Sequence, residues 1–151
     1  MYMKTWLFAW NPKRYTWEGA ADGYKELMTV ISQVGCAYIP WTCGVNKSIL
    51  PGDRIFLIRL GVKERGIVAS GHAATAVFKG THWDEALASK GKKTNRIYIK
   101  MDKIYNPTCP AIEYDLLCKI APDFKWSIQG SGVAIPEGIV EELEQIWNKV
   151  Q

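Results

Sequence analysis

The sequence predicts an α+β protein in which a curved, mostly antiparallel sheet or partial β-barrel is flanked by helices. Three observations favour this class. Strand-like segments dominate the middle of the chain, and helical periodicity is confined to its flanks. Residues 54–60 are apolar on both faces, which predicts a strand buried on both sides. Residues 66–77 are rich in Ala, Val and Gly, and a five-residue loop before them predicts a hairpin with the first strand.

Length and composition limit the organisation of the chain. Its 151 residues are enough for one domain with a real core, so residues 1–151 are expected to form a single unit. Apolar residues make up 48%, which argues against disorder. No apolar run reaches the ~20 residues of a membrane span, and the N-terminus lacks the features of a signal peptide. We therefore expect a cytoplasmic protein that does not bind a membrane.

The N-terminal part predicts a strand, a helix and a shorter strand. Residues 4–10 form the first strand, with Trp6, Phe8 and Trp10 on one face, and an Asn-Pro pair ends it. Residues 20–34 have helical periodicity. Residues 37–40 are an extended segment that carries Trp41 to its end, and the Pro51-Gly52-Asp53 turn precedes the hairpin. The apolar stripe of the helix consists of Tyr24, Leu27, Met28, Ile31 and Val34.

The C-terminal part predicts one more strand and two helices. Residues 89–96 form a basic, Gly-containing, solvated loop, and residues 96–105 alternate in polarity as in a half-buried strand. Residues 112–120 form a short helix or helical turn with Leu116, Leu117 and Ile120 inward. A polar loop follows at residues 126–132. Pro136 is expected as the first residue of the last helix, whose buried stripe is Ile139, Leu143, Ile146, Trp147 and Val150.

The chain contains no recognisable catalytic signature. The nucleophile elbow, the zinc-protease motif and the Walker loop are all absent, so we expect a protein that is not an enzyme and has no cofactor. A Cys43 nucleophile with His72 or His82 is one alternative, but a packed thiol is the more ordinary interpretation. The pair Asp84-Glu85 is expected to open a helix rather than to serve as a base. The four cysteines lack the spacing of a zinc site, so no metal is expected.

Tryptophan is the most informative residue type in the sequence. Four of the seven tryptophans, Trp10, Trp41, Trp83 and Trp126, lie at strand ends or in loops beside polar or small residues. Each one alone is as well explained by a place in the core. Together they favour an aromatic pocket for a base or a methylated ammonium group. The net charge of +4 is compatible with a nucleic-acid partner. Basic side chains that would follow phosphates, unless they are merely a solvated surface, are Lys13, Arg14, Lys47, Lys90, Lys92, Lys93 and Arg96.

Several short motifs occur in a characteristic order along nearly the whole chain. They are Trp10-Asn11-Pro12, Trp41-Thr42-Cys43-Gly44, Pro51-Gly52-Asp53-Arg54, Arg65-Gly66-Ile67, Ala69-Ser70-Gly71, His82-Trp83-Asp84, Trp126-Ser127 and Ser131-Gly132. With them the chain resembles EVE domains of the PUA-like superfamily, of the type found fused to HNH endonucleases. The resemblance implies a PUA-like fold. No HNH nuclease follows residue 151, so any cleavage is expected to come from a separate nuclease.

The resemblance also implies a site. EVE domains are similar to YTH domains, which hold a methylated adenine between tryptophans. By that likeness Trp41 and Trp83 are the expected walls of a base pocket, and Trp10 and Asn11 its floor. The remaining base-contacting residues are expected to be Thr42, Asn46, Ser127 and Gln129, and the phosphate-contacting residues Lys13, Arg14, Lys90, Lys92, Lys93 and Arg96.

The function that follows is recognition of a modified base in DNA, with 5-methylcytosine or 5-hydroxymethylcytosine the first choice. The base would leave the duplex and enter the aromatic pocket. Two alternatives stay open. One is a reader of modified RNA, as the YTH likeness suggests. The other is a small enzyme that acts on a nucleotide. The sequence does not determine which modification is bound.

Overall fold

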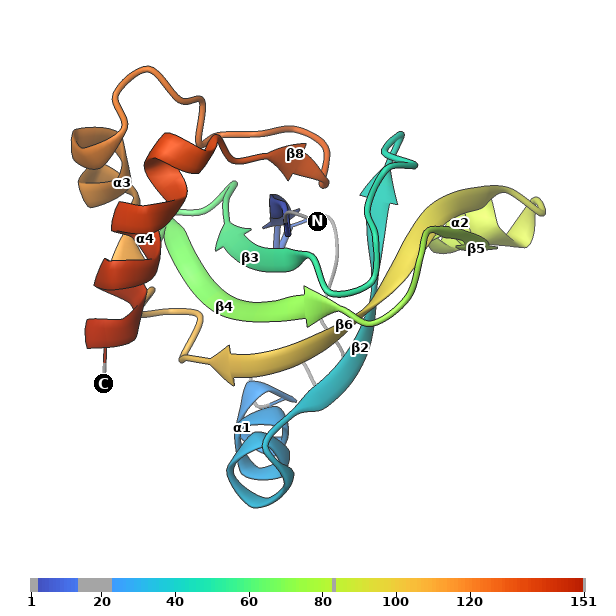
Figure 1. Ribbon diagram of the computed structural model, residues 1–151. Coiled ribbons are helices and arrows are strands. Elements are labelled where there is room, and N and C mark those ends of the chain that lie inside the picture. The colour runs from blue at the N-terminus through green and yellow to red at the C-terminus, as the bar shows by residue number, and fades with distance from the viewer. Residues whose placement is uncertain (1–2, 14–22, 83, 151) are drawn as a thin grey trace.

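The computed structural model describes residues 3–13, 23–82 and 84–150. Within these residues, eight strands form one mixed sheet that curls into a half-barrel, and helices lie outside it (Figure 1). The fold is α+β, with a curled, mostly antiparallel sheet flanked by helices, as predicted. The elements are β1 (Thr5–Trp10), α1 (Gly23–Val34), β2 (Ala37–Gly44), β3 (Arg54–Arg59), β4 (Gly66–Ala73), β5 (Phe78–Thr81), α2 (Glu85–Ser89), β6 (Lys93–Ile104), β7 (Ile112–Glu113), α3 (Tyr114–Ile120), β8 (Val133–Ala134) and α4 (Glu137–Lys149).

The strand order explains the curl. It runs β2-β6-β4-β3-β1-β8, with β5 paired to β6 and β7 paired to β4. The pairings are antiparallel except that of β1 with β3. Strand β6 is 12 residues long. Its first part pairs with β5 and β2, and its second part pairs with β4, so one strand belongs to both sides of the bend. Strands β2 and β8 end the main path, and the curl brings these two ends of the sheet toward each other.

The sheet buries side chains on both faces, as predicted for residues 54–60. Ile55 and Leu57 of β3 belong to a core inside the curl. Phe56 and Ile58 belong to a second core beneath α3 and α4. Strand β1 shows the predicted alternation, because Trp6, Phe8 and Trp10 join the first core while Leu7 joins the second. Since the central strands contribute side chains to both cores, a shift of one residue in strand register would move the side chains of each core into the other.

The turn before β3 is also as predicted. Gly52 has φ +94°, and the amide of Asp53 donates to the carbonyl of Leu50 over 3.1 Å. The buried Asp53 carboxylate accepts hydrogen bonds from Trp6 Nε1 (2.8 Å), Leu50 N (3.0 Å) and Lys4 N (3.2 Å). These bonds satisfy a buried charge and join the turn to β1. They place the starts of the two parallel strands side by side.

Two of the predicted helical stripes are too wide. In α1, Tyr24, Leu27 and Ile31 pack against the first core, but Met28 and Val34 are exposed. The helix touches β2 and β6 with a narrow face, so the edges of its apolar stripe stay in water. In α3, Leu117 is buried and Leu116 is exposed. The stripe of α4 is correct, although Pro136 is its N-cap and not its first residue.

The predicted loop at residues 89–96 is too long, because α2 ends at Ser89 and β6 begins at Lys93, and only residues 90–92 form the exposed turn between them. Strand β5, which precedes α2, was not predicted. The Asp84 carboxylate caps α2 by accepting from the amide of Ala86 over 2.9 Å, as the interpretation of Asp84-Glu85 as a helix start implied. Strand β5 forms because β6 offers it a partner, which local composition does not reveal.

Other strand boundaries also differ from the predicted ones. Trp41 lies inside β2 instead of after it, and β4 ends at Ala73 instead of residue 77. The two-residue strands β7 and β8 were not predicted at all. Such short strands exist only through their pairing with β4 and β1. None of the helices in the described ranges is long and apolar enough to cross a membrane.

Candidate nucleic-acid interface

A cavity of about 660 Å³ opens where the two ends of the curled sheet meet. Its walls come from the ends of β1 and β2, the start of β6, the loop between β3 and β4, and the loop before β8. The lining residues are Ala9, Trp10, Asn11, Pro40, Trp41, Thr42, Gly44, Val45, Leu60, Gly61, Arg65, His82, Thr94, Arg96, Ser127, Ile128, Gln129, Gly130 and Ser131.

Side chains join the two ends of the sheet at this point. Trp41 Nε1 on β2 donates to the carbonyl of Ala9 on β1 over 3.3 Å. The amide of Ala9 donates to Ser131 Oγ over 2.9 Å, and Asn46 Nδ2 donates to the carbonyl of Gly132 over 2.7 Å. These contacts replace a regular strand ladder.

Trp10 and Trp41 form an apolar wall of the cavity. Their side chains are largely packed, with exposed fractions of 9% and 4%. Both belong to the first core, which fixes the orientation of their rings. The expected partner wall, Trp83, lies outside the described residues. Trp126 is not a pocket aromatic, because it is 1% exposed and packs edge-on against Phe124 in the second core.

Polar side chains line the mouth of the cavity. Asn11, Thr42, Ser127 and Gln129, all predicted from the sequence, are among them. Thr42 Oγ1 lies 3.0 Å from Thr94 Oγ1 across the β2–β6 pair. Ser127 and Gln129 are exposed, and neither side chain makes a hydrogen bond to another described residue. Their donors and acceptors are therefore available to a ligand.

Asn46 has a different position from the one expected. It does not line the cavity. Its Nδ2 holds the carbonyl of Gly132, and its Oδ1 accepts from the amide of Ser48 over 2.6 Å. Both ends of the amide are thus used by the chain itself. Asn46 supports the loop that frames the cavity instead of facing a base.

Cationic side chains reach the cavity from two sides. Arg96 lines it from β6, and its Nη1 donates to the carbonyl of Thr81 over 2.8 Å. Arg65 lines it from the β3–β4 loop, with its guanidinium 3.9 Å from the centre of the Tyr114 ring. Arg65 belongs to the Arg65-Gly66-Ile67 motif, but no role in the site was predicted for it. Its position just before a core strand was the available signal. His82, also unassigned in the predicted site, is a further lining residue.

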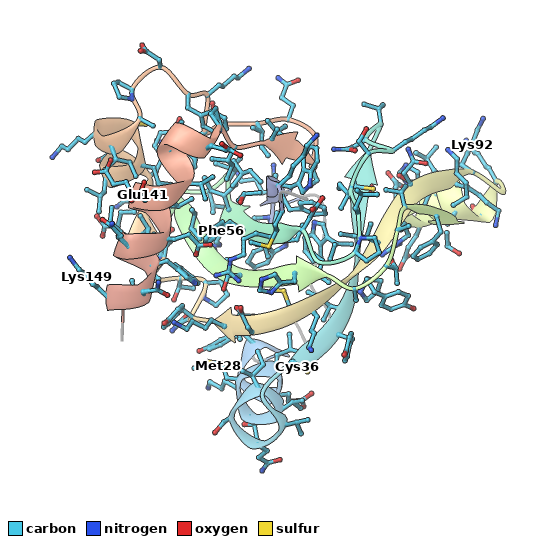
Figure 2. All side chains as sticks on the ribbon, in the orientation of Figure 1. Met28, Cys36, Phe56, Lys92, Glu141 and Lys149 are labelled. Atoms are coloured by element: carbon cyan, nitrogen blue, oxygen red, sulfur yellow. The ribbon has the colours of Figure 1, made fainter. Side chains whose placement is uncertain are left out.

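The other predicted phosphate contacts do not line the cavity. The arm is the part of the molecule formed by β5, α2 and the start of β6, and it projects from the sheet (Figure 2). The turn between α2 and β6 at its tip carries three exposed lysines, Lys90, Lys92 and Lys93. Lys13 is exposed beside Asn11, whose Oδ1 accepts from the Lys13 amide over 2.9 Å. Arg14 lies outside the described residues.

Cys43 is buried beside the cavity. Its Sγ lies 3.5 Å from the carbonyl of Asn46, and burial raises the pKa of the thiol to about 11. The thiol is therefore protonated at neutral pH, whereas a nucleophilic cysteine needs its thiolate. Among the described residues, no group of three His, Cys, Asp or Glu side chains could hold a metal ion.

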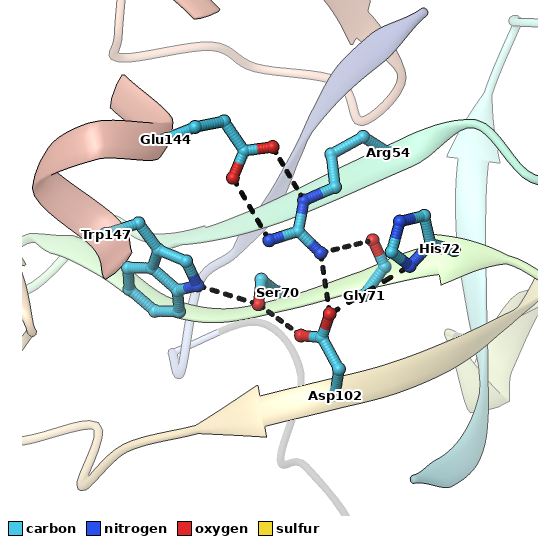
Figure 3. A network of polar contacts seen from close by, with 7 residues as sticks. All are labelled: Arg54, Ser70, Gly71, His72, Asp102, Glu144 and Trp147. Carbon is cyan, nitrogen blue, oxygen red and sulfur yellow. Dashed lines mark hydrogen bonds and ion pairs between the residues drawn. The ribbon is translucent and has the colours of Figure 1, made fainter. Parts of the chain in front are cut away.

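A second polar cluster, none of whose residues lines the cavity, joins β3, β4 and β6 to α4 (Figure 3). The guanidinium of Arg54 donates to both oxygens of Glu144 (3.0 and 3.2 Å) and to Asp102 (2.7 Å). Ser70 donates to Asp102 and accepts from Trp147 Nε1 over 2.9 Å. We call these five residues, Arg54, Ser70, Asp102, Glu144 and Trp147, the Arg54 network. It ties α4 to the sheet.

The Arg54 network and its neighbour His72 have shifted pKa values. Burial alone would raise the pKa of Asp102, but the hydrogen bond from Ser70 and the charge of Arg54 lower it. Burial, together with the nearby Arg54, lowers the pKa of His72. The native state therefore favours a charged Asp102 and a neutral His72.

Comparison with known proteins supports the fold. No protein-family model matches the chain, and no curated protein matches it. Human THYN1 in complex with DNA containing 5-methylcytosine is 12% identical, with a TM-score of 0.63 over 97% of this chain and 98% of that chain. Protein PSPTO5229 from Pseudomonas syringae is 14% identical, with a TM-score of 0.61 over 94% of this chain and 98% of that chain. ASCH from Zymomonas mobilis is 11% identical, with a TM-score of 0.52 over 94% of each chain. At these identities the likeness shows the fold alone, and it agrees with a PUA-like half-barrel.

Proposed function

We propose that this protein is an EVE-like module that recognises a modified base in DNA, with 5-methylcytosine or 5-hydroxymethylcytosine as the preferred ligand. The observation that carries the proposal is the cavity at the seam of the half-barrel. It combines a rigid tryptophan wall, exposed amide and hydroxyl groups, and arginines on two sides. The binding of 5-methylcytosine DNA by THYN1, which has a similar fold, supports this choice.

The cavity suits a base that has left its helix. Extrusion of a base costs a few kcal/mol, and stacking on an aromatic ring returns ~1–3 kcal/mol. Trp10 and Trp41 supply the apolar surface for the ring and for its methyl group. One methyl group in an apolar slot is worth about 1–3 kcal/mol, enough for a ten- to hundredfold preference. The modification thus decides whether the extruded state is populated.

The polar residues divide between base and backbone. In this proposal Ser127 and Gln129, which line the cavity, contact the edge of the base. Arg65 and Arg96 are placed to contact phosphates on either side of it. This division assigns base preference to one pair of residues and general affinity to the other.

The test is a titration by intrinsic tryptophan fluorescence at one fixed salt concentration. The ligands are short duplexes that differ only in cytosine, 5-methylcytosine, 5-hydroxymethylcytosine or N6-methyladenine, with matched RNA beside them. We expect one modified DNA to bind about tenfold tighter than its plain counterpart. Equal and weak binding of all ligands would overturn the proposal, and tightest binding of a modified RNA would replace DNA by RNA.

Variants of the cavity sharpen the test. Trp41→Ala is expected to abolish the base preference, but Trp41 is buried and its removal also weakens the core. The double variant Ser127→Ala with Gln129→Ala changes exposed residues only. It should keep the parent's thermal unfolding temperature and lower the preference. Gln33→Ala, an exposed residue of α1, is the matched control and should change neither quantity.

A charge variant addresses phosphate binding. Lys92→Ala with Lys93→Ala should weaken binding to every sequence by a similar factor and reduce the slope of log affinity against log salt by about 1–2. Lys119→Ala with Lys149→Ala removes two exposed charges from α3 and α4, and Lys149 lies far from Lys92 (Figure 2). An equal effect of both double variants would mean that binding responds to net charge and not to the arm.

A further inference from the structure

Three large aromatic side chains are exposed on one face of the sheet. Tyr38 of β2 is 59% exposed, Tyr98 of β6 is 42% exposed and Phe78 of β5 is 37% exposed. Tyr98 and Phe78 are stacked, with ring centres 5.8 Å apart and planes inclined by 21°. We call these three residues the aromatic strip. Single exposed aromatic residues are ordinary on a protein surface, but neighbours on three paired strands form a continuous patch.

The register places the aromatic strip at the edge of the cavity. Tyr98 is opposite Pro40 in the β2–β6 pair, and Phe78 is opposite Arg96 in the β5–β6 pair. Opposite residues of an antiparallel pair project from the same face. Pro40 and Arg96 both line the cavity. The strip lies on the face of β2 and β6 that points away from Trp41 and the first core, and it meets the rim of the cavity at Pro40 and Arg96.

The charges on this face favour an anionic ligand. Lys100 is opposite Tyr38, and Arg96 is opposite Phe78. Asp102, the next residue of β6 on this face, is ion-paired with Arg54 at 2.7 Å. Aromatic rings interleaved with basic side chains are the surface that binds unpaired nucleotides, because bases stack on the rings and phosphates follow the charges.

We propose that the aromatic strip stacks unpaired nucleotides next to the base in the cavity. The ligand would then be a modified base in a single-stranded or locally opened segment, and an intact duplex would bind less well. Bases in a duplex are already stacked and paired, so they cannot present their faces to Tyr38 or Tyr98. An unpaired segment also avoids the cost of extruding the base. This inference rests on the proposed function and specifies the form of its ligand.

The experiment compares one 5-methylcytosine DNA strand alone, in a full duplex, and in a duplex with a mismatched bubble around the modified base. Affinity is measured by fluorescence anisotropy of the labelled strand, with plain cytosine versions of each. We expect the single strand and the bubble to bind about tenfold tighter than the duplex, as one or two stacked bases imply. The double variant Tyr38→Ser with Tyr98→Ser should lose this excess and keep the parent's duplex affinity.

Two further variants make the result specific. Tyr38→Phe with Tyr98→Phe keeps the rings and should retain the excess. Leu116→Ser removes an apolar residue of similar exposure from α3 and should behave as the parent does. All of these positions are exposed, and thermal unfolding checks that each variant is folded.

The outcomes separate this inference from the proposed function. If the duplex binds as tightly as the single strand, or if the serine variants bind like the parent, the proposed role of the aromatic strip is wrong. A preference for the methylated base in the same experiment would still support the proposed function. Absence of a methyl preference in every probe would overturn the proposed function, whatever the strip does. Self-association of the parent that the serine variants lose would identify the strip as a protein interface and overturn the inference.

Discussion

The cavity at the seam and the Arg54 network are both polar regions beside tryptophans, yet they differ in how their polar groups are used. In the Arg54 network, Arg54 donates to two carboxylates, Ser70 donates to Asp102, and Trp147 donates to Ser70 (Figure 3). In the cavity, Ser127 and Gln129 make no side-chain hydrogen bond to another described residue, and Arg65 stacks on Tyr114.

The difference separates structure from function. A partly buried network whose members bond one another holds elements together, and the loss of any member destabilises the fold. Exposed polar groups around an apolar wall cost the folded state little and remain free for a ligand. The same residue types therefore predict opposite results when they are replaced, and the following predictions test that contrast.

The largest effect is expected from the two arginines. Arg54→Met leaves Asp102 and Glu144 without their cation, so we expect the free energy of unfolding to fall by about 3 kcal/mol. Arg65→Met removes an exposed cation and should change it by less than about 0.5 kcal/mol, while nucleic-acid binding weakens. Chemical denaturation and DNA titration of both variants check this. Equal losses of stability would remove the contrast between the two regions.

The next effect concerns the floor of the cavity. Gly61 and Gly91 both have φ +78°, so alanine is strained at either position by about 1 kcal/mol. A Cβ at Gly61 would also lie 2.4 Å from Asn11 Nδ2, whereas at Gly91 nothing lies within 4 Å. We therefore expect Gly61→Ala to lose about 1–2 kcal/mol more than Gly91→Ala and to weaken base preference by displacing Asn11. Denaturation midpoints and base titrations that do not differ between the two variants would exclude Asn11 from the site.

A smaller effect concerns pH. The pKa values of Asp102 and His72 are both lower in the native state than their ordinary values of 3.8 and 6.5. The unfolded chain thus binds more protons than the native one, and stability falls as pH decreases. The His72 contribution is lost as pH falls below about 6.5, and the Asp102 contribution as pH falls below about 4.

Thermal unfolding between neutral and acidic pH measures this dependence. His72→Gln should flatten the upper part of the profile and leave the lower part. A parent protein whose unfolding temperature rises on acidification would contradict the assignment. Base binding at constant pH should not respond to His72→Gln, because the residue does not line the cavity.

The smallest effect concerns thiol reactivity. Cys43 is buried with a pKa of about 11, and Cys109 is exposed. A thiol reagent at pH 8 should label Cys109 first and Cys43 last, with Cys43 reacting only on unfolding. Mass spectrometry of the labelled peptides gives the order, and Cys109→Ser should remove the fast phase. Rapid labelling of Cys43 would reopen the interpretation of this residue as a nucleophile.

The sequence by itself determined those features that depend on local residue patterns. The apolar run of β3 required burial on both faces, and the alternation in β1 divided its side chains between two cores. Pro51-Gly52-Asp53 required a turn, because Gly52 adopts φ +94° at no steric cost. Trp10 and Trp41 lie at or beside the end of a predicted strand, which favoured an aromatic pocket, whereas the expected roles of Asn11 and Thr42 came from the resemblance to YTH domains; all four line the cavity.

Only the tertiary structure decided the rest, because those features depend on partners distant in the sequence. Strand β5 exists through its pairing with β6, and Trp126 is buried because the second core forms around it. Asn46 is bonded to Gly132, which lies 86 residues away. Arg65 reaches the cavity, and Arg54 does not, because the β3–β4 hairpin carries them to different ends of the sheet. The chemistry of an arginine is set by its residue type, but its role is set by what the fold places beside it.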